Sequence, residues 1–166
     1  MKKILIFALS FSSLYCFSQE KSKIDFVFSP GIILQKDIFI DANVFIGDVV
    51  TDTSSKFPVV GVQGWRVGLE SNLQNGDSFV IAPKIGYELS ATLFSLRLSA
   101  VNYFQNGNSE FRILPELGYS FGGWANLTYG YGISFNDGNF TDTSNHRISL
   151  SFNLNRRLRK AAFKLY

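Results

Sequence analysis

The chain has 166 residues, enough for one domain, and carries a formal net charge of +3. Without Lys2 and Lys3 the charge is +1, and the five basic residues of the C-terminal tail leave about −4 for the remainder. Nucleic acid is therefore an unfavourable partner, because binding it needs a basic stripe over the fold itself.

Residues 1–18 have the form of a secretory signal peptide. Two lysines precede an apolar run at residues 4–9, which is too short to span a membrane as a helix. We expect cleavage after Ser18, with Cys16 and Ser18 as the small residues at −3 and −1, so that the mature chain lacks cysteine. Lipidation of Cys16 is the alternative, disfavoured by the large Tyr15 before it.

Residues 19–155 show the period-two alternation of β-strands and no sustained helical period. Pro30-Gly31 predicts a bulge or bend, and the polar stretches 48–58 and 137–145 predict loops. Residues 156–166 form a basic tail in which Leu158, Ala161, Ala162 and Leu165 would share one face of a short helix. The eight strand candidates are residues 23–34, 38–47, 59–73, 78–89, 92–104, 110–121, 124–136 and 146–155.

A hairpin pattern occurs twice, at residues 66–89 and 97–121. In each copy an Asn-Gly pair separates two alternating runs, which is the strongest short-range hairpin signal. A repeat this short cannot bury its apolar face alone, so the copies should lie side by side in one sheet. We predict an all-β fold, an eight-stranded antiparallel up-and-down transmembrane β-barrel.

Pro83 and Pro115 occupy matched positions in the two copies and cannot donate to a β-ladder. They predict a matched bulge or widened pairing, and a lateral opening toward lipid is the functional alternative. The glycines of 64–68 and 130–132 lie inside predicted strands, where they relieve crowding and form no phosphate loop.

The composition of the polar face favours a membrane barrel over a soluble one. A soluble barrel turns a charged face to water, whereas a membrane barrel turns its apolar face to lipid. Here the polar face is mostly Gly, Ser, Asn and Thr, and only 17% of the chain is charged. Small polar side chains suit the narrow interior of an eight-stranded barrel. The lengths of the predicted strands also match the about 9–11 residues that a tilted strand needs to cross a bilayer.

The charges on the polar face are balanced. They are also predicted to pair: Arg66 with Glu70, Lys84 with Glu88, and Arg112 with Glu116 each lie four residues apart on the same side. Asp25, Asp41, Arg97 and Arg147 complete five basic and five acidic groups. Since buried charges must be compensated, we expect them in a closed interior. Solvated charges on a soluble sheet are the alternative. The predicted structural network comprises Asp41, Arg66, Glu70, Lys84, Glu88, Arg97, Arg112, Glu116 and Arg147.

We expect no catalytic, cofactor or metal site, and therefore no enzyme. The single histidine, His146, is three residues from Ser149, and the period of two places them on opposite strand faces. This spacing disfavours a Ser-His hydrolase. One histidine and dispersed carboxylates also make a poor metal site.

Aromatic side chains at or near strand ends suit the girdles of a membrane barrel: Trp65, Tyr87, Tyr119, Trp124, Tyr129 and Tyr131. Three features together resemble the small outer-membrane β-barrel proteins of Gram-negative bacteria: the signal peptide, the eight alternating strands, and the stretch PELGYSFGGWANLTYGY at 115–131. The style is closest to such proteins of the Bacteroidota. The resemblance implies location in the outer membrane, contact with its lipid and lipopolysaccharide, and insertion by the outer-membrane assembly machinery. We expect a monomer. Such barrels usually end on an aromatic residue that closes the last strand. Here Phe152 lies in that strand and a basic tail follows it, with Tyr166 as the final residue.

The predicted role is structural, adhesive or that of a binding scaffold, carried by the loops 137–145 and 48–58. With eight strands and periplasmic termini, the first loop is extracellular and the second periplasmic. Two alternatives stay open: a narrow, porin-like channel or small-solute transporter, and a secreted soluble lipocalin-like binding barrel. The basic tail would be solvated, or would dock on anionic headgroups or a periplasmic polymer.

Overall fold

The computed structural model describes residues 24–52, 58–136 and 143–165. The expected signal peptide and most of the loop at 137–145 lie outside these ranges. The elements are β1 Asp25–Leu34, β2 Ile38–Asp52, β3 Val59–Ser71, η2 Gly76–Ser78, β4 Ile81–Ala91, β5 Phe94–Gln105, β6 Asn108–Phe121, β7 Ala125–Tyr131, β8 Ile133–Ser134, β9 His146–Phe152 and α2 Arg156–Leu165. No described helix is both long enough and apolar enough to cross a membrane.

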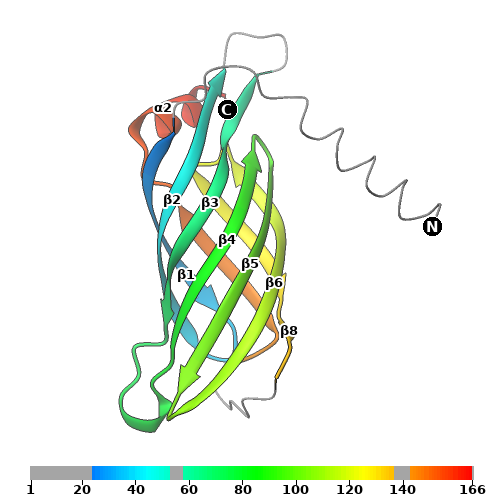
Figure 1. The fold of residues 1–166 in the computed structure, drawn as a ribbon. Helices are drawn as coiled ribbons and strands as arrows, with labels where there is room; N and C mark the ends of the chain where they lie inside the picture. The colour runs from blue at the N-terminus through cyan, green and yellow to red at the C-terminus, as the bar shows by residue number, and fades with distance from the viewer. Residues whose placement is uncertain (1–23, 53–57, 137–142, 166) are drawn as a thin grey trace, which may run out of the picture.

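The strands form one antiparallel sheet in the order β5-β4-β3-β2-β1-β9-β7-β6-β8, and pairing of β5 with β6 closes it into a barrel. β7 and β8 pair in succession with β6 and share one position, so the barrel is eight-stranded, as predicted. Figure 1 shows a tall, narrow barrel with tilted strands. We call the end near α2 the termini end, and the end with the β1–β2 and β5–β6 turns the far end.

Strand alternation places large apolar side chains on the outer wall and most polar ones inside. On the outer wall, Leu96, Leu117 and Tyr119 are 53%, 62% and 73% exposed. Inside, Arg66 and Glu88 are 2% and 0% exposed. The structure therefore confirms the predicted orientation, in which the apolar face of the sheet points outward and the polar face points inward.

The interior has three layers along its axis. A far-end layer contains Ile33, Phe39, Val80, Ala82, Val101, Tyr103 and Leu114. A termini-end layer contains Val27, Phe45, Val60, Val62, Leu158 and Ala162. The charged side chains lie mainly between them. The sequence interpretation missed both apolar layers, because it assigned the interior to small polar and charged residues alone.

The tail forms α2, with Leu158 and Ala162 fully buried and Ala161 and Leu165 packed against the same layer. Asn155 begins the helix, since its Oδ1 accepts hydrogen bonds from the main-chain N–H groups of Arg157 at 2.9 Å and Leu158 at 3.1 Å. The helix contacts β2 and β3. It thereby covers the termini end of the barrel (Figure 1).

Several strand boundaries differ from the predictions, and two of these differences change a connection between strands. β2 continues to Asp52, which pairs with Val59, so residues 48–52 belong to a long hairpin rather than to a loop. Val49 and Val50 favour this extension because β-branched residues fit a strand. At the other end of β3, residues 72–80 form a wide connection instead of a tight Asn-Gly turn.

The two Asn-Gly pairs behave differently. Asn106 and Gly107 have φ angles of 46° and 79°, and Gln105 pairs with Asn108 around them, so this is the predicted two-residue turn. In the first copy the Asn72 side chain binds the main chain instead, donating to Ser78 O at 2.7 Å and accepting from Val80 N at 2.9 Å. These bonds stabilise the wider loop.

Pro83 and Pro115 each lie beside a break in one ladder, while the ladder on the other side stays paired. The β4–β5 pairing stops after Ile81 and resumes at Lys84 in the same register. Pairing of β6 likewise stops after Ile113 and resumes at Glu116. The result is interrupted pairing without a bulge.

Pro30 produces no bulge either, and the prediction of an interruption in β1 was wrong. β1 pairs with β2 in unbroken register from Asp25 to Leu34. The effect of Pro30 falls on the opposite side, where pairing with β9 begins only at Gly31. A proline that lacks its N–H toward one neighbour leaves the other ladder intact.

Candidate functional site

The nine residues predicted to form a charge network all lie inside the barrel, and none is more than 8% exposed. A tenth, Glu110, is 5% exposed and takes the place that the sequence interpretation gave to Asp25. Among the described residues, the interior therefore holds five basic and five acidic side chains: Arg66, Lys84, Arg97, Arg112 and Arg147 with Asp41, Glu70, Glu88, Glu110 and Glu116. Formal neutrality is what a closed interior of low dielectric requires.

Glu70 on β3 is one centre of the network. Arg147 on β9 donates to it twice, at 2.8 Å and 3.0 Å. Lys84 Nζ donates at 2.9 Å and the Tyr103 hydroxyl at 3.2 Å. Both carboxylate oxygens thus have partners, which satisfies a buried charge.

Glu88 on β4 is the second centre. Arg66 on β3 donates to it, and Arg97 Nε on β5 lies 3.2 Å from Oε2. The other carboxylate oxygen accepts from Ser90 at 2.7 Å, Asn126 at 3.1 Å and Asn153 at 3.3 Å. Glu88 therefore connects strands on both sides of the barrel.

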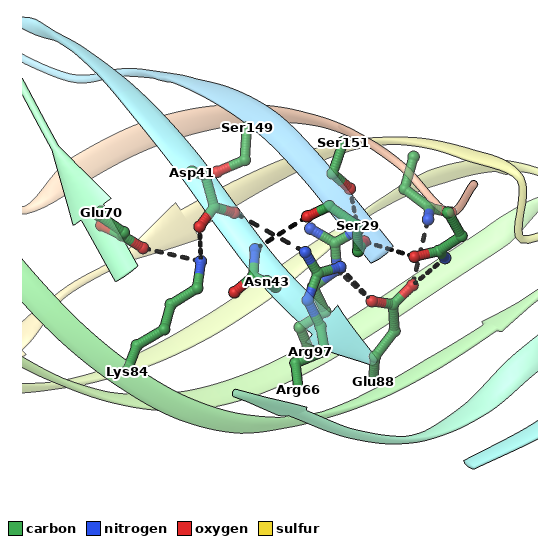
Figure 2. A network of polar contacts seen from close by, with 12 residues as sticks. Ser29, Asp41, Asn43, Arg66, Glu70, Lys84, Glu88, Arg97, Ser149 and Ser151 are labelled. Carbon is green, nitrogen blue, oxygen red and sulfur yellow. Dashed lines mark hydrogen bonds and ion pairs between the residues drawn. The ribbon is translucent and has the colours of Figure 1, made fainter. Parts of the chain in front are cut away.

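Asp41 on β2 connects the two centres (Figure 2). Its Oδ1 lies 2.6 Å from Lys84 Nζ, and its Oδ2 lies 3.7 Å from Arg66 Nη2. Lys84 belongs to the Glu70 centre and Arg66 to the Glu88 centre, so one carboxylate links them. The network is continuous along the middle of the barrel.

Two further acidic groups, Glu116 and Glu110, belong to the network. Glu116 accepts a hydrogen bond from Ser149 at 2.9 Å and lies 3.5 Å from Arg147 Nε. Arg112 donates to Glu110 at 2.6 Å and to the Thr143 hydroxyl at 2.8 Å. Arg112 thereby ties β6 to the chain just before β9.

The pairs predicted from four-residue spacing are not the pairs that form. Arg66 contacts Glu88 and Asp41 rather than Glu70, and Lys84 contacts Glu70 and Asp41 rather than Glu88. Four residues along one strand span about 13 Å, too far for direct contact. The partners instead come from other strands across the interior.

Asp25 and Arg112 also differ from the predicted arrangement. Asp25 lies at the rim and accepts hydrogen bonds from Arg157 of α2 at 2.7 Å and 2.9 Å. Arg112 pairs with Glu110, not Glu116. The sequence interpretation missed Glu110, although this residue shares strand parity with Arg112 and Glu116 and could have been placed inside by that signal.

His146 and Ser149 lie on opposite faces of β9, as their spacing predicted. His146 is exposed, with its Nδ1 2.5 Å from the Tyr129 hydroxyl. Ser149 is buried and donates to Glu116. Within the described ranges, no group of three or more His, Cys, Asp or Glu residues could hold a metal ion.

Among the pockets on the surface of the described residues, two bear on the site. One, of about 440 Å³, lies at the far end beside the chain that precedes β9; it is lined by Leu34, Gln35, Lys36, Tyr129, Thr143, Ser144, His146, Arg147 and Ile148. The other, of about 520 Å³, lies on the outer wall beside the break at Pro83 and includes Ile85, Ala100 and Asn102.

Comparison with protein-family models, with curated proteins and with solved structures finds no match for this chain. The class that the fold itself defines is a closed eight-stranded antiparallel β-barrel with a charged, packed interior.

Proposed function

We propose that this chain is a non-enzymatic β-barrel protein of the bacterial outer membrane that acts as a rigid scaffold for its far-end loops. One observation carries the proposal: the outer wall bears large exposed apolar side chains on every strand, while ten charged side chains of the described chain are enclosed. Soluble monomers rarely expose apolar patches larger than a few hundred Å². Hydrocarbon is the solvent in which this distribution is favourable.

The interior supports a scaffold rather than a conduit. Apolar layers lie toward both ends of the barrel, and α2 covers one of them. Between them, the charges are joined to partners on several strands. A barrel held in this way keeps its shape when its loops contact a partner.

The far end of the barrel is the surface that we propose for binding a partner. With periplasmic termini, the far end faces the cell exterior, and it carries the pocket of about 440 Å³ beside Thr143, Ser144 and His146. Lys36 and Gln35 approach this pocket from the β1–β2 turn. We propose this end as the contact site for an external partner, in a structural or adhesive role.

Cell fractionation followed by gel migration with and without heating tests the proposal. We expect the protein in the outer-membrane fraction, soluble only with detergent, and migrating faster before heating than after, since an unheated barrel stays compact. Recovery from buffer without detergent would contradict the proposal and would favour the lipocalin-like alternative.

A further inference from the structure

We propose that α2 and the aromatic cluster beside it form a binding surface for anionic phospholipid headgroups at the termini end. The aromatic cluster is Phe121, Trp124, Phe152 and Phe163. This inference rests on the proposed function, because it places the termini end at a membrane surface.

The helix is anchored to the barrel by its apolar side. Leu158 and Ala162 are fully buried in the termini-end layer, and Arg157 binds Asp25 at the rim. These contacts leave only the opposite side of α2 for a partner. The position of that side relative to the barrel is therefore set by packing.

The remaining side of α2 is strongly basic. The helix sequence RRLRKAAFKL has no acidic residue, and within the described ranges Arg156, Arg159, Lys160 and Lys164 form no ion pair. All four are exposed. Four uncompensated cations on ten residues make a surface that attracts anions.

The aromatic cluster places an apolar group among these cations. Phe163 is 61% exposed, and its ring lies 5.4 Å from that of Trp124 and 5.3 Å from that of Phe121. Arg159 and Lys160 precede Phe163 by four and three positions, so they lie on the same side of the helix. Aromatic side chains of this kind favour the boundary between hydrocarbon and headgroups.

The combination selects an anionic lipid over other anions. A soluble polyanion would neutralise the basic side chains but would leave Phe163 in water. A zwitterionic lipid would accept Phe163 but would bring no net charge. An anionic phospholipid such as phosphatidylglycerol satisfies both, because it attracts the basic side chains and accepts the aromatic ring.

The chain offers a local reporter, because Trp65 and Trp124 are its two tryptophans. Trp65→Phe leaves Trp124, which contacts Phe163. This variant would be reconstituted in two preparations of phosphatidylcholine vesicles. One contains a small fraction of acyl-brominated phosphatidylglycerol, and the other contains the same fraction of acyl-brominated phosphatidylcholine. From the quenching of Trp124 fluorescence, we expect an association constant for phosphatidylglycerol at least about fivefold higher than that for phosphatidylcholine, the equivalent of roughly 1 kcal/mol.

Charge removal provides the decisive comparison. The variant R156Q/R159Q/K160Q/K164Q in the same background should lose the preference while keeping heat-modifiable migration. Asp77→Asn, a charge change at an exposed position of η2 away from α2, should keep it. Equal quenching by the two lipids, or a preference that survives charge removal, would overturn the inference and leave the proposed function standing. Quenching by neither lipid would also overturn the inference, while fractionation and heat-modifiable migration decide the proposed function separately.

Discussion

Arg147 on β9 and Glu70 on β3 meet across the middle of the barrel through two hydrogen bonds, although they lie 77 positions apart in the chain. Their strands are not neighbours, since β1 and β2 lie between them. The contact thus joins two parts of the barrel wall through the interior, and not through hydrogen bonds between neighbouring strands of the sheet. Its removal provides the first test of the interior network.

Arg147→Met should lower the free energy of unfolding by about 3–5 kcal/mol, because it leaves a buried carboxylate without its two-point partner. The measurement is a urea titration of the folded protein in phosphatidylcholine vesicles, which carry no net charge. Arg156→Met, at an exposed position of α2, is the matched control and should change the value by no more than about 0.5 kcal/mol. Equal effects of the two variants would argue against a stabilising network.

Gly118→Ala should destabilise the barrel by about 1–3 kcal/mol through overpacking. A Cβ at Gly118 would lie 2.0 Å from Leu127 O and 2.6 Å from Thr128 Cα, both main-chain atoms of β7. The strands would have to move apart to admit it. Ser109→Ala, at an exposed position of the same strand, is the control. An unchanged urea midpoint for Gly118→Ala would show that β6 and β7 do not approach this closely.

Leu158→Ala should cost about 2–5 kcal/mol, since it opens a cavity in the termini-end layer beside Phe45 and Val60. The expected readout is a lower urea midpoint, with the circular dichroism of the sheet retained. Lys164→Ala on the exposed side of α2 should leave the midpoint unchanged. If both variants behave alike, α2 does not contribute to closing the barrel.

Reconstitution in planar bilayers should give no stepwise conductance. The far-end layer places Phe39, Tyr103 and Leu114 across the interior, each at most 1% exposed. Discrete current steps that scale with protein concentration would instead support the channel alternative. An eight-stranded barrel of known channel activity serves as the positive control for insertion.

The faces of the strands were predictable from the sequence because alternation is a local property. Shifting a strand by one residue exchanges its faces, so Leu96 and Arg97 can be assigned to opposite sides without knowing any neighbour. The same parity would have placed Glu110 inside. The tight turn at Asn106-Gly107 was predictable for a similar reason, since a two-residue turn depends on its own residues.

The ion-pair partners were not predictable, because they depend on the register between strands. Arg66 meets Glu88 only because Arg66 pairs in register with Gly86 on β4, two residues from the carboxylate. The wide loop at 72–80 depends on side-chain bonds of Asn72 that compete with the Asn-Gly signal. The apolar layers required knowing which interior positions lie near each end.

The central claim is that the apolar outer wall contacts hydrocarbon. It is tested most directly by a nitroxide attached at Leu96→Cys in the mature protein in lipid vesicles, since Leu96 lies outward on β5. Its collision rates with oxygen and with a water-soluble nickel chelate would be compared by electron paramagnetic resonance. We predict frequent collisions with oxygen and few with nickel, while a label at the exposed Asn108 beside the β5–β6 turn shows the reverse. Frequent collisions of the Leu96 label with nickel would contradict the account.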